Sequence, residues 1–247
     1  MSDTIRVHGI VISSMPVGEY DKRIVMLTKE MGKISAFARK ARRPNSHLLG
    51  VTNAFVYGEI ELYRGKSYYT ISNIKASEYF TDVTSDIDKM MLGTYLLEVA
   101  GYFAQENNDE KERLLLLYRT LQVLGTGSMS LELIRCIFEY RTMVINGVYP
   151  NVFECGKCGR KDELVAINNN LEGVKCKFCA ERDGYSECRP IKSSTMYTLQ
   201  YVVGSSIKKL YSFELKPEIE NEFILIIERL RVKYLNYEFK SASFLKI

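Results

Sequence analysis

Hydrophobic and polar residues alternate through the first third of the chain. β-Branched and aromatic residues occur there in short runs, which Gly, Pro, Asn and Ser interrupt, and this spacing is typical of strands joined by turns. We expect five strands, near residues 5–13, 23–28, 33–41, 55–63 and 68–78. Five strands with a long connection after the third predict a small Greek-key barrel such as the OB-fold, although SH3-like barrels give a similar pattern.

Beyond Ser85 the hydrophobic positions recur every three or four residues, as they do in amphipathic helices. The pattern predicts helices over residues 85–103 and 110–124, and a third helix that ends near Gly147. It resumes at Ser193, and Pro217 opens a last long helix. The chain therefore reads as an α+β multidomain protein, in which a five-stranded barrel precedes a helical domain.

Four of the six cysteines form two CxxC pairs, Cys155 with Cys158 and Cys176 with Cys179. A CxxC turn places two thiolates on one ion, and two such turns complete the tetrahedron that zinc requires. Four thiolates leave no open position for a catalytic water, so we expect one structural Zn²⁺ ion. Two separate redox pairs and an iron–sulfur cluster are the alternatives.

The other two cysteines carry no pattern of their own. Cys136 lies among hydrophobic residues and is interpreted as a small buried side chain, whereas Cys188 has no assigned role. With the metal segment placed inside the helical part, the expected domains are the barrel at 1–80, the helical domain at 81–152 and 182–247, and the four-cysteine zinc module at 153–181.

No hydrophobic run reaches the roughly 18 residues that a membrane helix requires. The first residues also lack the hydrophobic core of a signal peptide. We therefore expect a cytoplasmic protein that is associated with the nucleoid if it binds DNA, and no membrane partner.

Positive charge is concentrated in the barrel segment. Residues 1–80 contain twelve Lys or Arg against seven Asp or Glu, whereas the whole chain has a formal charge of only +4. Aromatic residues are interleaved with these cations, and OB-folds bind single strands by stacking bases on aromatic rings while cations contact the phosphates. Alternation places about half of these aromatics in the core. The candidate nucleic-acid contacts are Arg39, Lys40, Arg42, Arg43, Arg23, Lys33, Arg64, Lys66, Tyr57 and Tyr69.

Six short segments carry a family resemblance, at residues 7–12 (VHGIVI), 18–21 (GEYD), 27–34 (LTKEMGKI), 58–63 (GEIELY), 95–98 (YLLE) and 147–150 (GVYP). Together they resemble the RecO family of bacterial DNA repair and recombination mediator proteins. The resemblance covers roughly residues 5–180, and the later helices match in pattern only. Glu19 and Asp21 belong to these segments, and we interpret them as turn residues and not as catalysts.

The resemblance implies an OB-fold, a helical domain and a zinc module, in the order that the hydrophobic pattern and the cysteine spacing predict. It also implies binding of single- and double-stranded DNA, annealing of complementary strands without ATP, and help in loading RecA onto coated single strands. The implied partners are a RecR-type protein, the C-terminal tail of single-stranded DNA-binding protein, and a RecF-type protein.

The residues by themselves leave other functions open. We expect no enzyme, because there are two histidines, no phosphate-binding loop and no free metal position. Acidic residues that converge in space would permit a metal-dependent nuclease. A zinc-stabilised adaptor that binds protein and not DNA is the other alternative.

Overall fold

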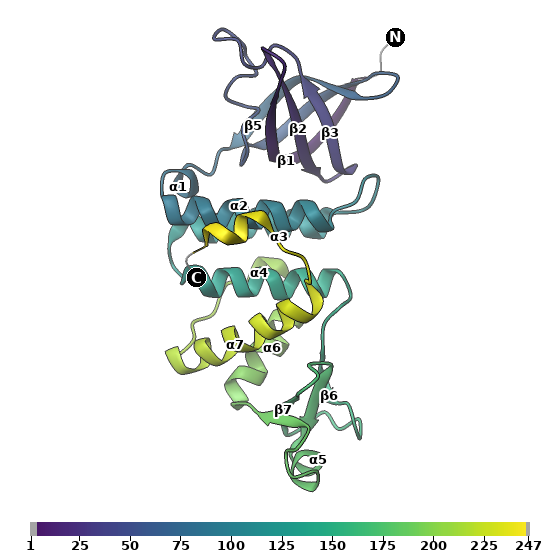
Figure 1. The fold of residues 1–247 in the computed structure, drawn as a ribbon, viewed down its shortest axis with the longest axis vertical. Helices are drawn as coiled ribbons and strands as arrows, with labels where there is room; N and C mark the ends of the chain where they lie inside the picture. Colours follow the sequence, from purple (N-terminus) through teal and green to yellow (C-terminus); the bar gives the residue numbers. More distant parts are fainter. Residues whose placement is uncertain (1–3, 246–247) are drawn as a thin grey trace. The chain divides into compact units, whose positions relative to one another are not determined.

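The computed structural model describes residues 4–245, which form two compact units. The first unit contains residues 4–128 and 239–245, and the second runs from Met129 to Glu238. Figure 1 shows the barrel of the first unit and the helices and small sheet that follow along the chain. The expected domain limits at residues 80, 152 and 181 stay predictions.

The first unit begins with a closed five-stranded barrel. Its strands pair in the order β1-β2-β3-β5-β4, and β1 also pairs with β4. The expected barrel of the OB type, followed by helices, is confirmed. The strands are β1 (Thr4–Val17), β2 (Asp21–Thr28), β3 (Gly32–Ala38), β4 (Tyr57–Arg64) and β5 (Tyr69–Glu78).

The long strand β1 closes the barrel because its two halves have different partners. Its first half pairs with β4 and its second half pairs with β2. Gly9 lies where the two pairings overlap, and a Cβ atom there would approach the backbone oxygen of Leu27 to 2.4 Å. A side chain at this position would therefore force the two strands apart.

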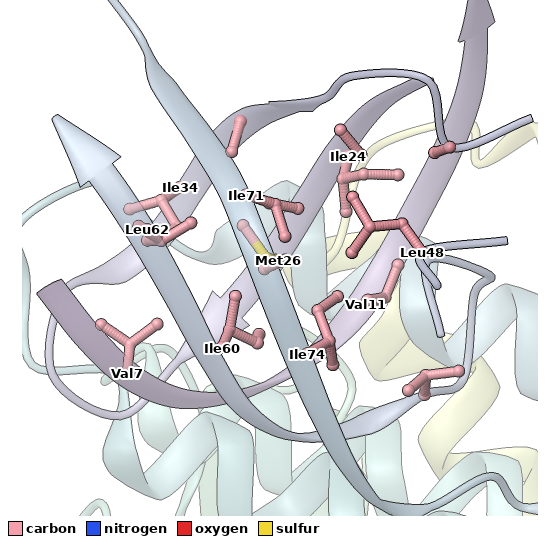
Figure 2. Close-up of a cluster of buried hydrophobic side chains, with 14 residues drawn as sticks. Val7, Val11, Ile24, Met26, Ile34, Leu48, Ile60, Leu62, Ile71 and Ile74 are labelled. Carbon is pink, nitrogen blue, oxygen red and sulfur yellow. The ribbon is translucent and has the colours of Figure 1, made fainter. Parts of the chain in front are cut away.

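Alternate residues of β1 to β4 point into the barrel interior, and β5 contributes Ile71 and Ile74 on either side of an irregularity in its pairing with β4. In β3, for example, Ile34 and Ala36 are buried while their neighbours are only partly covered. Figure 2 shows how the buried side chains from the strands and from Leu48 of the β3–β4 connection converge. This core makes the barrel a rigid support for its surface.

Strand β3 ends at Ala38, three residues before the expected end at Ala41. Lys40 has a φ of 56°, a left-handed conformation that a strand does not contain. The following connection is held by the Lys22 ammonium group, which donates to Leu49 O, Thr52 Oγ1 and Asn53 Oδ1. Burial, together with nearby Arg42, lowers the pKa of Lys22.

Three helices and a C-terminal 3-10 helix complete the first unit. They are α1 (Thr81–Thr84), α2 (Ile87–Phe103), α3 (Lys111–Thr126) and η2 (Lys240–Phe244). The Glu98 carboxylate of α2 accepts the backbone N–H groups of Lys240 and Ser241 and the Ser241 hydroxyl. Phe239 packs edge-on against Tyr95 at 5.7 Å between ring centroids. The C-terminal segment is thus fixed to α2.

The second unit combines helices with a four-stranded sheet in the order β6-β8-β7-β9. Its helix α4 is buried along most of its length, and Cys136 lies inside it as expected. Cys188 is also buried, beside Ala166 and Ala180. The elements are α4 (Leu131–Ile145), β6 (Asn151–Cys155), β7 (Leu164–Asn168), β8 (Gly173–Cys176), α5 (Lys177–Arg182), β9 (Cys188–Pro190), α6 (Ser193–Gly204), η1 (Ile207–Lys209) and α7 (Pro217–Tyr234).

Candidate nucleic-acid groove and metal centre

A groove of about 520 Å³ lies on the barrel where β2, β3 and the β4–β5 turn come together. We call it the barrel groove. Strands β3 and β5 pair in parallel here, with Ala36 opposite Tyr69, and this pairing brings the β4–β5 turn beside β3. The groove is lined by Arg23, Ile34, Ser35, Phe37, Arg64, Gly65, Lys66, Ser67, Tyr68, Tyr69, Glu106 and Asn107. Four candidate contacts, Arg23, Arg64, Lys66 and Tyr69, are therefore neighbours in space.

Aromatic rings form one side of the barrel groove. Tyr68 is 44% exposed, and its ring stands edge-on to Phe37 with 5.4 Å between the centroids. The Arg39 guanidinium donates to the Tyr68 hydroxyl at 2.8 Å and lies 6.0 Å from the ring centroid. Exposed rings beside cations can stack on bases while the cations contact phosphates.

The lining of the barrel groove carries more positive than negative charge. Its cations are Arg23, Arg64 and Lys66, and its one acidic residue is Glu106. Arg23 donates to the hydroxyl of Ser35 at 3.0 Å. In the described part of the chain, Arg64 and Lys66 are exposed and form none of the ion pairs found. Their charge remains available to an anion.

The cluster from Arg39 to Arg43 does not act as one patch. Arg39 reaches toward the barrel groove, but Arg42 donates to the backbone oxygens of Gly18 and Glu19, at 3.3 and 3.1 Å. Arg43 lies 4.8 Å from the ring centroid of Tyr20. These two arginines therefore brace the β1–β2 turn.

The turn also receives a contact from the backbone of this cluster. Lys40 donates its backbone N–H to the Asp21 carboxylate at 2.7 Å, while its side chain is exposed. Asp21 opens β2 directly after the turn that contains Glu19. This placement agrees with the interpretation of both acidic residues as turn residues.

The last two candidate contacts, Lys33 and Tyr57, also lie outside the lining of the barrel groove. Lys33 donates its ammonium group to Gly101 O at 2.8 Å. The ring of Tyr57 packs against Tyr118 of α3 with 4.7 Å between centroids. Burial raises the pKa of the Tyr57 phenol, with smaller contributions from Tyr118 and Glu30. A nucleic-acid contact by Lys33 or Tyr57 stays a prediction.

The α2–α3 connection reaches the barrel groove although no sequence pattern predicts it. Glu106 and Asn107 line the groove, and the Asn107 N–H donates to Met31 O at 3.0 Å. An isolated β-bridge joins Glu106 to Gly32. These residues are far apart in the sequence, so no local hydrophobic pattern predicts that they contact each other.

The four cysteines of the CxxC pairs converge in the second unit. Their Sγ atoms all lie within 4.8 Å of one another, and those of Cys158 and Cys176 are 3.7 Å apart. Zinc–thiolate bonds of about 2.3 Å in a tetrahedron imply sulfur separations of about 3.8 Å. The quartet can therefore hold one metal ion, and its geometry fits zinc.

Backbone hydrogen bonds favour the thiolate form of one cysteine of this quartet, Cys155. Burial raises the pKa of the Cys155 thiol. Hydrogen bonds from the backbone N–H groups of Cys176, Lys157 and Cys158 more than offset this effect and bring the pKa down to about 6. The first knuckle closes by hydrogen bonds between Cys155 and the backbone of Gly159 and Arg160. Metal ligands must be thiolates, so donors aimed at sulfur favour binding.

Two lysines next to the cysteine quartet are neutralised by ion pairs. Lys157 and the buried Lys175 both donate to Asp183, at 2.8 and 3.0 Å. Hydrogen bonds from Lys157 and then from Lys175 lower the pKa of the Asp183 carboxyl group. Lys175 also contacts Glu187 at 3.0 Å. These two lysines stabilise the four-cysteine segment by ion pairs and therefore offer little free charge to a polyanion.

None of the helices within residues 4–245 combines the length and hydrophobicity that spanning a membrane would need.

Comparison with known proteins gives matches along almost the whole chain. A family model described as Recombination protein O N terminal matches residues 1–80, and one described as Recombination protein O C terminal matches residues 84–242. Among curated proteins, the DNA repair protein RecO of Acetivibrio thermocellus is 30% identical over 247 residues, covering 98% of this chain and 96% of the relative.

Two further relatives carry the same printed name, DNA repair protein RecO. The one from Halalkalibacterium halodurans is 27% identical, over 97% of this chain and 93% of its own length. The one from Alkaliphilus metalliredigens is 26% identical, over 94% of each chain. Similarity therefore extends across both compact units.

Proposed function

Because the chain belongs to the RecO family of DNA repair proteins, we propose that it is a non-enzymatic DNA-binding mediator of recombination. It binds single- and double-stranded DNA and anneals complementary strands without a nucleotide cofactor. The observation that carries this proposal is the barrel groove, which combines exposed cations with aromatic rings.

The chemistry of the barrel groove suits a single strand. Arg64, Lys66 and Arg23 can neutralise phosphates, and Tyr68 and Tyr69 offer rings for unpaired bases. Phosphate contacts position a strand without reading its sequence. Annealing needs charge neutralisation and release of the paired product, and neither step requires hydrolysis of ATP.

Partners are proposed from the family and not from a contact in the structure. A RecR-type protein and the C-terminal tail of single-stranded DNA-binding protein are the first candidates, and a RecF-type protein is a further one. Acting with them, the protein would help RecA load onto coated strands. Such a protein works on chromosomal DNA, so we place it in the cytoplasm with the nucleoid.

One Zn²⁺ ion is proposed for the cysteine quartet. Cys155, Cys158, Cys176 and Cys179 would all be ligands, so the ion would cross-link the ends of β6 and β8 to α5. Four thiolates complete its coordination, and its contribution would be structural.

The proposal is tested by anisotropy measurements with labelled single-stranded DNA at several salt concentrations. Arg64→Ala combined with Lys66→Ala should weaken binding and flatten the slope of log affinity against log salt by about 1.4, at about 0.7 per phosphate. The matched control is Lys29→Ala combined with Lys75→Ala, two exposed lysines outside the groove lining. Equal affinity and slope for both double variants would place the DNA site elsewhere.

Two assays separate the alternative functions. An adaptor without direct DNA binding would give no anisotropy change with any strand. A metal-dependent nuclease would shorten DNA during incubation with Mg²⁺, whereas a mediator returns strands of unchanged length. Strand annealing in buffer without ATP is the positive outcome for the proposed function.

A further inference from the structure

A second groove, of about 610 Å³, lies on the second unit and is independent of the barrel. We call it the α6 groove. Helix α6 supplies one wall, and the segment before α7 supplies the other. The lining residues are Ser193, Ser194, Tyr197, Thr198, Tyr201, Ser212, Phe213, Glu214 and Leu215.

Three aromatic rings follow one another along the α6 groove. The centroids of Tyr197 and Tyr201 are 6.3 Å apart with an interplanar angle of 38°, and those of Tyr201 and Phe213 are 5.3 Å apart at 78°. Tyr197 is 66% exposed, more than any tyrosine of the barrel groove. Exposed aromatic rings that are grouped in one groove, and not scattered singly, are typical of a binding site.

The middle ring of the series is fixed in place. The Tyr201 hydroxyl donates to Lys209 O at 2.7 Å and lies 3.1 Å from the Ser212 hydroxyl. Ser212 in turn donates to Lys209 O at 2.8 Å. These bonds tie the two walls together, so the aromatic surface is preorganised for a ligand.

Lysines flank the lining of the α6 groove in the sequence, namely Lys192, Lys208, Lys209 and Lys216, and Glu214 lies in the lining itself. At the start of α6 the Glu222 carboxylate accepts the Lys192 N–H and the Thr195 hydroxyl. Lys192 contacts Glu218 O at 3.4 Å. Among residues 4–245, no ion pair found involves the other three lysines, which are exposed. Their charge would attract an anionic ligand.

We propose that the α6 groove binds a single strand of nucleic acid. Unpaired bases stack on Tyr197 and Tyr201, and the sugar–phosphate backbone passes Lys208 and Lys209. A series of rings with cations on its border is the chemistry that holds unpaired strands without reading their sequence. This goes beyond the proposed function, which needs the barrel groove alone.

The α6 groove gives the protein a second place for a strand. Each compact unit would then hold one strand, so a single chain could bring two complementary strands together. An acidic peptide would also meet the lysines, but it has no flat bases to cover successive rings. We therefore favour the strand and make the peptide an outcome of the test.

Photo-cross-linking of the full chain maps the contact directly. A thymidine oligonucleotide with 5-iodouracil in place of thymine is irradiated with the protein, and the adducts are located by mass spectrometry. We expect adducts on Tyr197 or Tyr201 as well as on tyrosines of the barrel groove. Adducts confined to residues 4–128 would overturn the inference and leave the proposed function intact.

Variants give a second, quantitative measurement. In a chain that already carries Arg64→Ala and Lys66→Ala, Tyr197→Ala should weaken single-strand binding about fivefold or more. Lys208→Ala with Lys209→Ala should flatten the remaining salt slope by about 1.4. Tyr79→Ala, at a tyrosine that is 46% exposed outside both grooves, is the control and should change neither quantity.

Three other outcomes would contradict the inference. If the variants of the α6 groove bind DNA like their parent, the groove is no strand site, although the barrel proposal stands. If an eight-residue Asp/Glu peptide binds there and strands do not compete with it, the ligand is a peptide. If the wild-type chain binds no DNA at all, both proposals fail together.

Discussion

Arg39 and Tyr68 are joined by a hydrogen bond of 2.8 Å, although 29 residues separate them in the sequence. The bond connects the segment after β3 to the β4–β5 turn and holds a cation beside an exposed ring. Arg42, three residues later, serves the β1–β2 turn instead. Arg39 and Arg42 therefore contact different parts of the barrel, and single substitutions can distinguish their effects on DNA binding and on stability.

Arg39→Ala should reduce the affinity for single-stranded DNA and flatten the salt slope by about 0.7, because one phosphate contact is lost. The melting temperature should hardly change, since the side chain is exposed. Anisotropy titrations at several salt concentrations measure the slope. An unchanged slope would mean that the Arg39–Tyr68 pair serves the turn and not the strand.

Arg42→Ala should give the opposite result. Its guanidinium bonds two backbone oxygens, so its loss should cost roughly 1 kcal/mol of the free energy of unfolding and leave the salt slope nearly constant. Urea denaturation gives the first quantity, and the same titrations give the second. A variant that keeps full stability but loses DNA affinity would contradict this assignment.

Tyr57→Ala should destabilise the barrel by about 2 kcal/mol, because a partly buried ring that packs against Tyr118 is removed. Tyr57→Phe keeps the ring and should be close to wild type. Denaturation curves of the two variants make the comparison. If instead both fold like the wild type and Tyr57→Ala alone loses DNA affinity, the ring stacks on bases.

Removal of the proposed Zn²⁺ ion should unfold the four-cysteine module and also loosen α7. Lys233 and Tyr234 of α7 donate to backbone oxygens of Asn170 and Leu171 in the β7–β8 turn. Hydrogen exchange before and after chelation should show lost protection in residues 151–190 and at the end of α7. Barrel amides should keep theirs. Elemental analysis finding no zinc in a folded, protected module would rule out the structural ion.

The contact between Glu98 and η2 should weaken in acid. Burial raises the pKa of Glu98, but hydrogen bonds from Ser241 and Lys240 outweigh it and hold the pKa below the ordinary value of 4.5. A carboxyl group with a depressed pKa stabilises the fold above its unfolded pKa, and this contribution is lost as the pH falls through the folded pKa.

Urea denaturation at pH 7 and at several values below 4.5 tests this contact. The wild type should be more stable than Glu98→Gln at neutral pH, and the difference should shrink as the pH falls. Asp109→Asn is the control, since Asp109 also has a lowered pKa but is exposed and, within residues 4–245, bonds its near neighbour Lys111. A difference that stays constant with pH would show that Glu98 acts by packing alone.

The sequence predicts those features that depend on neighbouring residues. Alternation along each strand reflects one face in the core, so the five strands of the barrel could be read directly. The quartet of Cys155, Cys158, Cys176 and Cys179 was equally accessible, because each CxxC turn fixes two sulfurs locally. The end of β3 was missed because the left-handed conformation of Lys40 has no signature in a non-glycine residue.

Features that depend on distant residues escaped prediction. The barrel groove forms only when β3 and β5 pair in parallel, and nothing local to either strand specifies that partner. Likewise, the cluster from Arg39 to Arg43 looks uniform in the sequence. Its arginines point in different directions because Arg39 bonds the Tyr68 hydroxyl, whereas Arg42 bonds the backbone oxygen of Gly18.

The return of residues 239–245 to α2 has a consequence for how the protein is made. On the ribosome, the barrel and its first helices emerge early, but Phe239 and the partners of Glu98 follow only after the entire second unit. Domains fold during synthesis as their residues emerge. The first unit therefore lacks the contact between Phe239 and Tyr95 until the second unit has been translated. Chaperones that shield apolar surface would have their longest opportunity to bind there.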